Sequence, residues 1–180
     1  AANAVANNLD GMAILGGQAL GLATITVVGQ CVGAGDYAQA RRYNRKLMII
    51  SWLLIAASAA AILTSLPLLL NLYNISDEAR VLSAQLVRLH NIPAVALWCL
   101  SFTLPNTLRA AGDARFTMVV SIVSMAVFRI GFSVVLGIWM GLGAIGVWIA
   151  MDIDWVCRVI CFVARYFSGA WTRKYQNYQA

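Results

Sequence analysis

Charged residues are scarce in this sequence. Aspartate, glutamate, lysine and arginine make up 11% of its 180 residues, whereas hydrophobic residues make up 61%. A soluble globular domain carries about 25% charged residues, and a soluble domain of this length cannot keep so much apolar surface away from water. The composition therefore excludes an ordinary soluble domain and predicts an all-α, polytopic integral membrane bundle.

Residues that bind metals or carry out catalysis are also few. The chain has one histidine, His90, and four cysteines without any CxxC pair: Cys31, Cys99, Cys157 and Cys161. We interpret the cysteines as small apolar packing residues and predict no metal site, no cofactor and no enzymatic activity. His90 stands beside Arg88 and Asn91 near one end of an apolar run. We interpret it as a surface or interfacial histidine in preference to a proton relay.

Five apolar runs organise the chain, and each is long enough to cross a hydrocarbon core of about 30 Å. They span residues 11–34, 47–73, 81–108, 116–138 and 142–165. Residues 1–8 are interpreted as the tail of a preceding helix. The chain starts without an initiator methionine and shows no signal peptide, so we expect it to be the C-terminal piece of a longer protein.

The connectors between the runs predict the orientation in the membrane. Of the 13 basic residues, most lie in three places: residues 35–46, residues 109–115 and the tail 166–180. The positive-inside rule places these segments in the cytoplasm, so the net charge of +6 reflects topology and not nucleic-acid binding. Gly35–Asp36 and Gly112–Asp113 each follow an apolar run, which is typical of a helix end and the N-cap of the next helix.

Ionised residues inside an apolar run are costly and usually face a protein interior or a watery cavity. Asp154 and Arg158 are four residues apart, so we expect a structural ion pair on one helix face. Asp152 points to another face, and Arg129 in the fourth run is the partner that we expect for it. Two interpretations stay open: these charges only lock helices together, or Asp152 or Asp154 faces a cavity and handles a proton, a cation or a cationic substrate.

Proline and tryptophan add two further expectations. Pro93 and Pro105 lie within the third run, where proline bends a helix and frees carbonyl groups. The bend either serves a moving transport helix or is needed only for packing. Trp139, Trp148 and Trp171 are expected near the membrane interfaces.

Three motifs together resemble the multidrug and toxic compound extrusion (MATE) family of transporters. They are LATITVVGQCVGAGDYAQARR at 22–42, FTLPNTLRAAGDARFTM at 102–118 and GLGAIGVWIAMDIDWVCR at 141–158. Each is weak alone, but they follow the family's order and spacing and cover nearly the whole chain. The positions that carry the signature are Gly29, Gln30, Gly33, Leu108, Arg109, Gly112, Asp113, Trp148 and Trp155.

The resemblance implies half of a transporter with twelve helices in two lobes. Residues 1–180 would form the C-terminal lobe, with its C-terminus in the cytoplasm, in the inner (plasma) membrane. Its partners would be the lipid bilayer, the missing N-terminal lobe, a small organic cation and H⁺ or Na⁺, exchanged by alternating access. Some members carry a cation-binding carboxylate in the helix that matches 81–108, and this run has none.

Two other functions stay open. A lipid-linked oligosaccharide flippase of the same broad superfamily would need a cationic cavity, so an unpaired, cavity-facing Arg129 would favour it. An Arg129 that is paired with Asp152 or Asp154 would favour the cation exporter. A non-transporting membrane scaffold is the third possibility, although intramembrane charges and a proline-bent helix argue against it.

Overall fold

A computed structural model describes residues 1–172, and every regular element in them is helical. The α-helices are α1 (Ala2–Gly33), α2 (Tyr37–Leu72), α3 (Asp77–Trp98), α4 (Leu104–Ala110), α5 (Ala114–Ser124) and α6 (Gly143–Phe167). Three π-helical segments lie between them: η1 (Cys99–Thr103), η2 (Met125–Gly131) and η3 (Val134–Trp139). The predicted all-α membrane bundle is confirmed. Arg173, Lys174 and the rest of the predicted tail to Ala180 lie outside the described residues.

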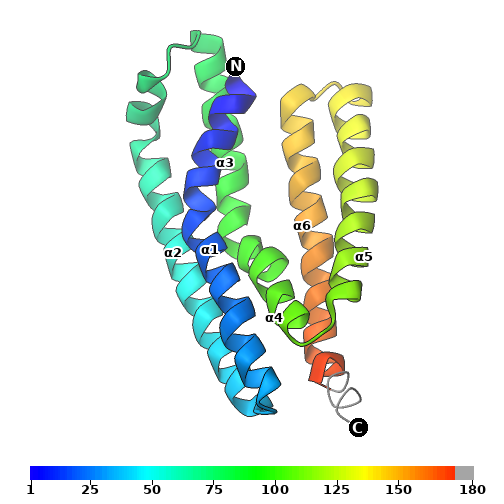
Figure 1. The fold of residues 1–180 in the computed structure, drawn as a ribbon. Coiled ribbons are helices and arrows are strands. Elements are labelled where there is room, and N and C mark those ends of the chain that lie inside the picture. Colours follow the sequence, from blue (N-terminus) through cyan, green and yellow to red (C-terminus); the bar gives the residue numbers. More distant parts are fainter. Residues whose placement is uncertain (173–180) are drawn as a thin grey trace.

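The helices form two groups (Figure 1). The first contains α1, α2 and α3, and the second is a hairpin in which α6 runs beside the continuous stretch α5–η2–η3. The short α4 joins the two groups at the end of the molecule opposite the N-terminus. Two clusters of buried apolar side chains hold the groups together, and both include residues of α1, α2, α3 and α6.

Four of the helical stretches are long and apolar enough to cross a membrane. They are Ala2–Gly33, Tyr37–Leu72, Asp77–Ala110 and Ala114–Trp139. The predicted fifth run corresponds to α6, which has 25 residues but carries Asp152, Asp154 and Arg158 in its middle. Because of these charges, α6 is not one of the four apolar spans. The residues that pair with the charges therefore determine how α6 packs in the bundle.

Two predicted boundaries are wrong. Residues 1–8 are not the tail of a separate helix, because α1 runs without a break from Ala2 to Gly33. The basic connector 35–46 is mostly helical, since α2 already begins at Tyr37. The side chain of Asp36 caps α2 as expected and accepts a hydrogen bond of 2.8 Å from the backbone N–H of Gln39. Asp113 precedes α5 without making such a side-chain cap.

The third run changes its helical geometry between the two prolines. Pro93 lies inside α3, Pro105 lies in the first turn of α4, and η1 occupies the space between them. A proline cannot donate a backbone hydrogen bond, and local π-helical geometry is one way in which a membrane helix re-satisfies the backbone groups that the proline frees. Figure 1 shows that α4 is displaced from the line of α3. The bend brings α4 next to the ends of α5 and α6 that lie opposite the N-terminus.

Two of the three tryptophans that are expected near the membrane interfaces pack against other parts of the chain. Trp139 is exposed, but Trp148 and Trp171 each retain only 1% of their accessible surface. The indole N–H of Trp148 donates to Asn3 Oδ1 at 2.8 Å, and that of Trp171 donates to the carbonyl of Tyr166 at 3.1 Å. A buried tryptophan needs such an acceptor. The bond from Trp148 also ties α6 to the start of α1.

Candidate functional site

One histidine and two aspartates from three helices meet inside the bundle. Nδ1 of His90 on α3 lies 2.7 Å from Oδ1 of Asp152 on α6. Nε2 of the same ring lies 3.7 Å from Oδ2 of Asp10 on α1. The imidazole is completely buried, and both carboxylate side chains retain less than a fifth of their exposure. We call these three residues the histidine–aspartate triad.

The surroundings of the triad explain its fixed position. The His90 ring packs edge-on against Trp148 with centroids 4.9 Å apart, and its centroid lies 4.5 Å from that of Trp155.

The burial and pairing of His90 show that two predictions are wrong. His90 is not a surface or interfacial residue, and Asp152 pairs with His90 and not with Arg129.

The triad is short of positive charge and of hydrogen bonds. Two ionised carboxylates beside one imidazole leave a net negative charge even when the imidazole is protonated. Asp10 Oδ1 and His90 Nε2 are both buried without a hydrogen-bond partner among residues 1–172. Buried groups of this kind normally find a partner, because an unpaired one costs about 1–3 kcal/mol. The arrangement is thus suited to take up a proton or a cation.

The geometry favours a proton over a metal ion. Nδ1 and Asp152 Oδ1 already contact each other at hydrogen-bond distance, so a metal ion has no room between them. No group of His, Cys, Asp and Glu side chains in the described part of the chain is arranged to hold a metal.

Asp10 also lines a cavity of about 540 Å³ between α1, the bent third run, η2 and α6. Three aromatic side chains, Trp98, Phe102 and Trp155, contribute to its wall. Aromatic faces attract organic cations, and a carboxylate adds direct charge complementarity. Apolar walls with a few polar groups are typical of small-molecule sites.

Two arginines line the same cavity. Arg109 donates to Asn106 Oδ1 at 3.0 Å and to Thr117 at 3.3 Å. Arg129 forms no ion pair with any carboxylate of residues 1–172. It also borders a second cavity beside η3. An unpaired, cavity-facing Arg129 is the feature that favours an anionic substrate.

Asp154 lies away from this cavity. Its carboxylate is completely buried. Oδ1 accepts a hydrogen bond of 3.0 Å from Arg158 Nε, and Oδ2 lies 3.0 Å from Arg158 Nη2 in the same ion pair. The hydroxyl of Ser124 on α5 also donates to the carboxylate, and Arg158 donates to the carbonyl of Ser121 at 3.3 Å. These contacts join α6 to α5.

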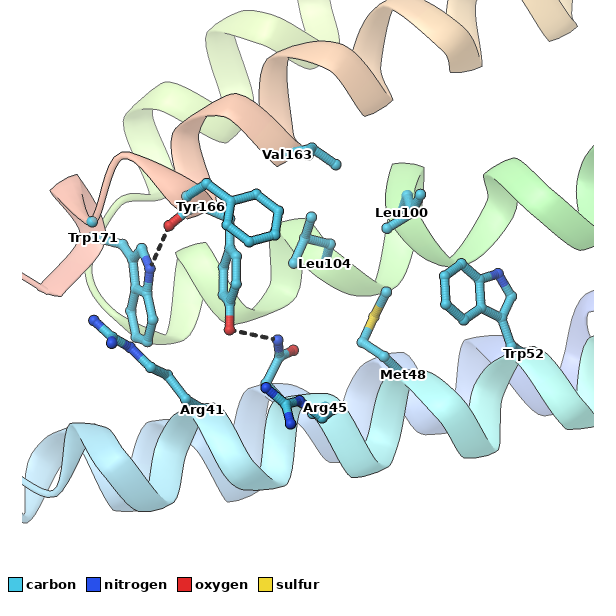
Figure 2. Close-up of a pocket in the computed structure, with 12 residues that line it drawn as sticks. Arg41, Arg45, Met48, Trp52, Leu100, Leu104, Val163, Tyr166 and Trp171 are labelled. Carbon is cyan, nitrogen blue, oxygen red and sulfur yellow. Dashed lines mark hydrogen bonds between the residues drawn. The ribbon is translucent and has the colours of Figure 1, made fainter.

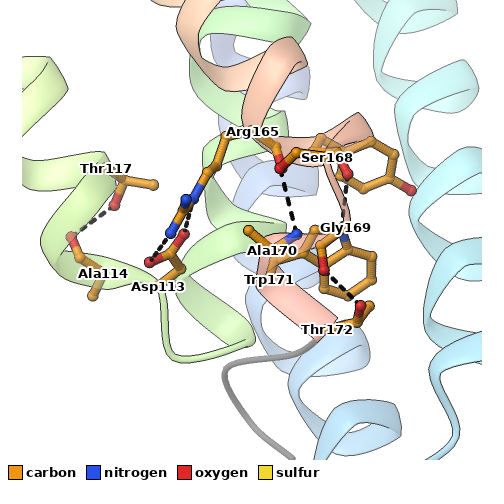
Figure 3. Close-up of polar contacts among 10 residues, drawn as sticks. Asp113, Ala114, Thr117, Arg165, Ser168, Gly169, Ala170, Trp171 and Thr172 are labelled. Carbon is orange, nitrogen blue, oxygen red and sulfur yellow. Dashed lines mark hydrogen bonds and ion pairs between the residues drawn. The ribbon is translucent and has the colours of Figure 1, made fainter.

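A second ion pair fixes the connector between α4 and α5 (Figure 3). The guanidinium of Arg165 donates to both oxygens of Asp113, at 2.7 and 3.3 Å. It also lies over the ring of Phe116, 4.7 Å from its centroid. These contacts hold the Arg165 side chain against the connector between α4 and α5. Gly112 just before this aspartate has a φ of +81°, a conformation that glycine adopts most readily.

The remaining signature positions lie at helix ends and helix contacts. Gly29, Gln30 and Gly33 lie in the last turns of α1, and Leu108 is buried in α4. Trp148 and Trp155 surround His90. Asp10 was missed because it stands between residues 1–8 and the run that begins at residue 11. An acid so close to an apolar run is a signal that could have identified it.

Comparisons with known proteins agree with the resemblance drawn from the sequence motifs. The MatE family model matches residues 1–135. The "Uncharacterized transporter YisQ" of Bacillus subtilis (strain 168) is 27% identical over 169 residues, which is 93% of this chain and 36% of the relative. "Multidrug and toxin extrusion protein 1" of Oryctolagus cuniculus is 22% identical over 158 residues, 88% of this chain and 28% of the relative. The chain thus spans about a third of these relatives, and no solved structure matches it.

Proposed function

Because the chain belongs to the MatE family of transporters, we propose that it is the C-terminal lobe of an exporter of organic cations. The cavity beside Asp10 carries this proposal. It combines one buried carboxylate with the aromatic side chains Trp98, Phe102 and Trp155. These are the groups that recognise a bulky cation with delocalised charge.

The histidine–aspartate triad is the proposed site of ion coupling, with H⁺ as the ion. A cation in the cavity neutralises Asp10, and so does a proton that enters the triad. The two therefore compete for the same negative charge. Such competition couples their binding reciprocally, which is what an exchanger needs. The 2.7 Å contact between His90 and Asp152 favours H⁺ over Na⁺ as the coupling ion.

Transport requires the rest of the protein. An N-terminal lobe would complete the cavity, and the two lobes would rock against each other in alternating access. Protonation drives this motion only if the two states bind the proton unequally. The basic residues of 35–46 and 109–115 support a cytoplasmic position for these segments, in an inner (plasma) membrane.

The proposal is tested with full-length protein in liposomes and tetraphenylphosphonium as the organic cation. An imposed pH gradient should drive uptake of this cation, and Asp10→Asn should abolish uptake. Asp77→Asn is the matched control, since Asp77 is exposed and pairs only with Arg80 among the described residues. Uptake that depends on a Na⁺ gradient alone, or full activity of the Asp10 variant, would contradict the proposal.

The second candidate is a flippase for an anionic, lipid-linked substrate. Arg129, which has no ion-pair partner in residues 1–172, lines the cavity together with Arg109, and both favour this candidate. A phosphate group would be recognised by these two guanidinium groups. The aromatic wall and Asp10 favour a cation instead, and a substitution at Arg129 distinguishes the two.

A further inference from the structure

A groove separate from the triad and its cavity lies at the basic end of α2 (Figure 2). It has a volume of about 550 Å³ and runs between α2, the η1–α4 region and the end of α6. Small-molecule sites have volumes of about 300–1,000 Å³. The proposed transport function does not use this groove.

The α2 wall of the groove changes from charged to apolar along the helix. Arg41, Arg45, Met48 and Trp52 line it at intervals of four, three and four residues, so they form one stripe. The two arginines lie at the end near the basic connector, and the apolar side chains follow towards the middle of the span. Leu100, Leu104 and Val163 complete the apolar part. Figure 2 shows the same order along the groove.

The length of this stripe matches one leaflet of a membrane. Eleven residues separate Arg41 from Trp52, which corresponds to about 16 Å of helix. Half of a hydrocarbon core of about 30 Å is about 15 Å. A molecule that lies along the stripe can therefore place a head group at the arginines and an acyl chain within the leaflet.

The charge at the head end has no counterpart in the described structure. None of the groove-lining residues is acidic. Arg41 and Arg45 are exposed and form no ion pair with any residue of 1–172. The guanidinium carbon of Arg41 lies 5.8 Å from the ring centre of Trp171, which is stacked on Tyr166 with centroids 5.4 Å apart.

The groove is also built on a fixed base. Asn44 is buried between the two arginines, and its amide donates to the Tyr166 hydroxyl at 3.1 Å. Its carbonyl oxygen accepts a hydrogen bond of 2.6 Å from Thr107 on α4. These bonds join α2 to both other walls, so the spacing of the walls does not depend on a bound molecule.

We propose that this groove binds an anionic phospholipid of the leaflet that faces the basic connectors. The phosphate group would lie at Arg41 and Arg45, and one acyl chain would lie against Met48 and Trp52. Basic pockets between transmembrane helices on the cytoplasmic side are suited to such head groups. Under the orientation proposed above, this is the cytoplasmic leaflet.

The test uses full-length protein in nanodiscs of phosphatidylcholine to which a brominated lipid is added. Bromine on an acyl chain quenches a tryptophan that it contacts, and Trp52→Phe provides the background from the other tryptophans. Each basic residue near an anionic surface strengthens binding about fivefold. Brominated phosphatidylglycerol should therefore quench Trp52 at roughly 20- to 30-fold lower content than brominated phosphatidylcholine.

Two matched variants decide the outcome. Arg41→Gln/Arg45→Gln should remove most of the preference for phosphatidylglycerol. Arg42→Gln/Lys46→Gln removes the same charge from the same turns but leaves the groove unchanged, so it should retain the preference. Equal loss in both variants would reduce the effect to general surface charge and overturn the site. Absence of Trp52 quenching by either lipid would show that another part of the protein covers the groove, which also overturns it.

Neither overturning outcome affects cation transport. Because the groove and the Asp10 cavity share no lining residue, failure of the lipid site and failure of the proposed function are separate results.

Discussion

His90 and Asp152 form a buried contact of 2.7 Å that joins α3 to α6. The pair crosses from the group α1–α3 to the hairpin of α5 and α6, and Asp10 extends it to α1. Any change in charge at this contact therefore acts on both groups of helices at once. Protonation at this contact would therefore act on the packing between the two groups of helices.

Asp152→Asn should shift the competition between protons and cations. Loss of this carboxylate removes one negative charge beside His90, so the remaining triad binds a proton less tightly. The pH at which protons displace half of the bound tetraphenylphosphonium should move to a more acidic value. A titration of cation binding between neutral and acidic pH measures it, with Asp77→Asn as the control. An unchanged midpoint would remove Asp152 from the coupling site.

Arg158→Ala should destabilise the protein strongly. It leaves the completely buried carboxylate of Asp154 without its cation, and breaking a buried ion pair costs about 3–5 kcal/mol. Thermal unfolding in detergent measures this loss. Replacing both partners with apolar residues, Asp154→Leu/Arg158→Met, should recover most of the stability.

The same pair of variants separates the two roles considered for Asp154. If Asp154 only holds α6 against α5, the recovered double variant keeps cation transport. If transport is lost although the fold is stable, Asp154 takes part in ion coupling.

The sequence predicts the membrane class and the helices well, since long apolar runs are a strong signal. It also predicts the ion pair of Asp154 and Arg158, because the two residues lie four positions apart within one helix. The triad is different. Asp10, His90 and Asp152 are 80 and 62 positions apart along the chain, and only the packing of three helices brings them together. Periodicity within one run carries no information about such neighbours.

The start of α2 illustrates a second limit. Positive charge in residues 35–46 indicates a connector by composition, and the charges do lie at the end of the span. Yet arginine and lysine are good helix formers, and the Asp36 side chain caps the helix. The helix therefore extends well beyond its apolar part. Hydropathy predicts the membrane-embedded portion and not the helix end.

Gly146→Ala should loosen the hairpin formed by η3 and α6. A Cβ atom at this position would lie 2.7 Å from the carbonyl carbon of Leu136 and 2.8 Å from the nitrogen of Gly137. Both are backbone atoms, so the helices must separate. The expected loss of stability is about 1–3 kcal/mol. Gly11→Ala is the control, because nothing lies within 4 Å of its Cβ position. Equal unfolding temperatures for both variants would contradict the close contact.

Arg129→Gln should reveal the charge of the substrate. Arg129 lines the cavity with Asp10 and has no ion-pair partner in residues 1–172. If the substrate is an organic cation, removing this positive charge strengthens binding of tetraphenylphosphonium, by about fivefold for an effect of about 1 kcal/mol at a partly solvated distance. If the substrate is an anionic, lipid-linked compound, the same variant lowers its transport. In that case the wild-type protein itself does not transport tetraphenylphosphonium. Equilibrium binding of tetraphenylphosphonium to the full-length protein measures the first outcome.

The control is Arg88→Gln, because Arg88 is an exposed arginine outside the cavity. This variant should leave the affinity for tetraphenylphosphonium unchanged. Weaker cation binding in the Arg129 variant would contradict the exporter, since a cation gains nothing from a neighbouring guanidinium.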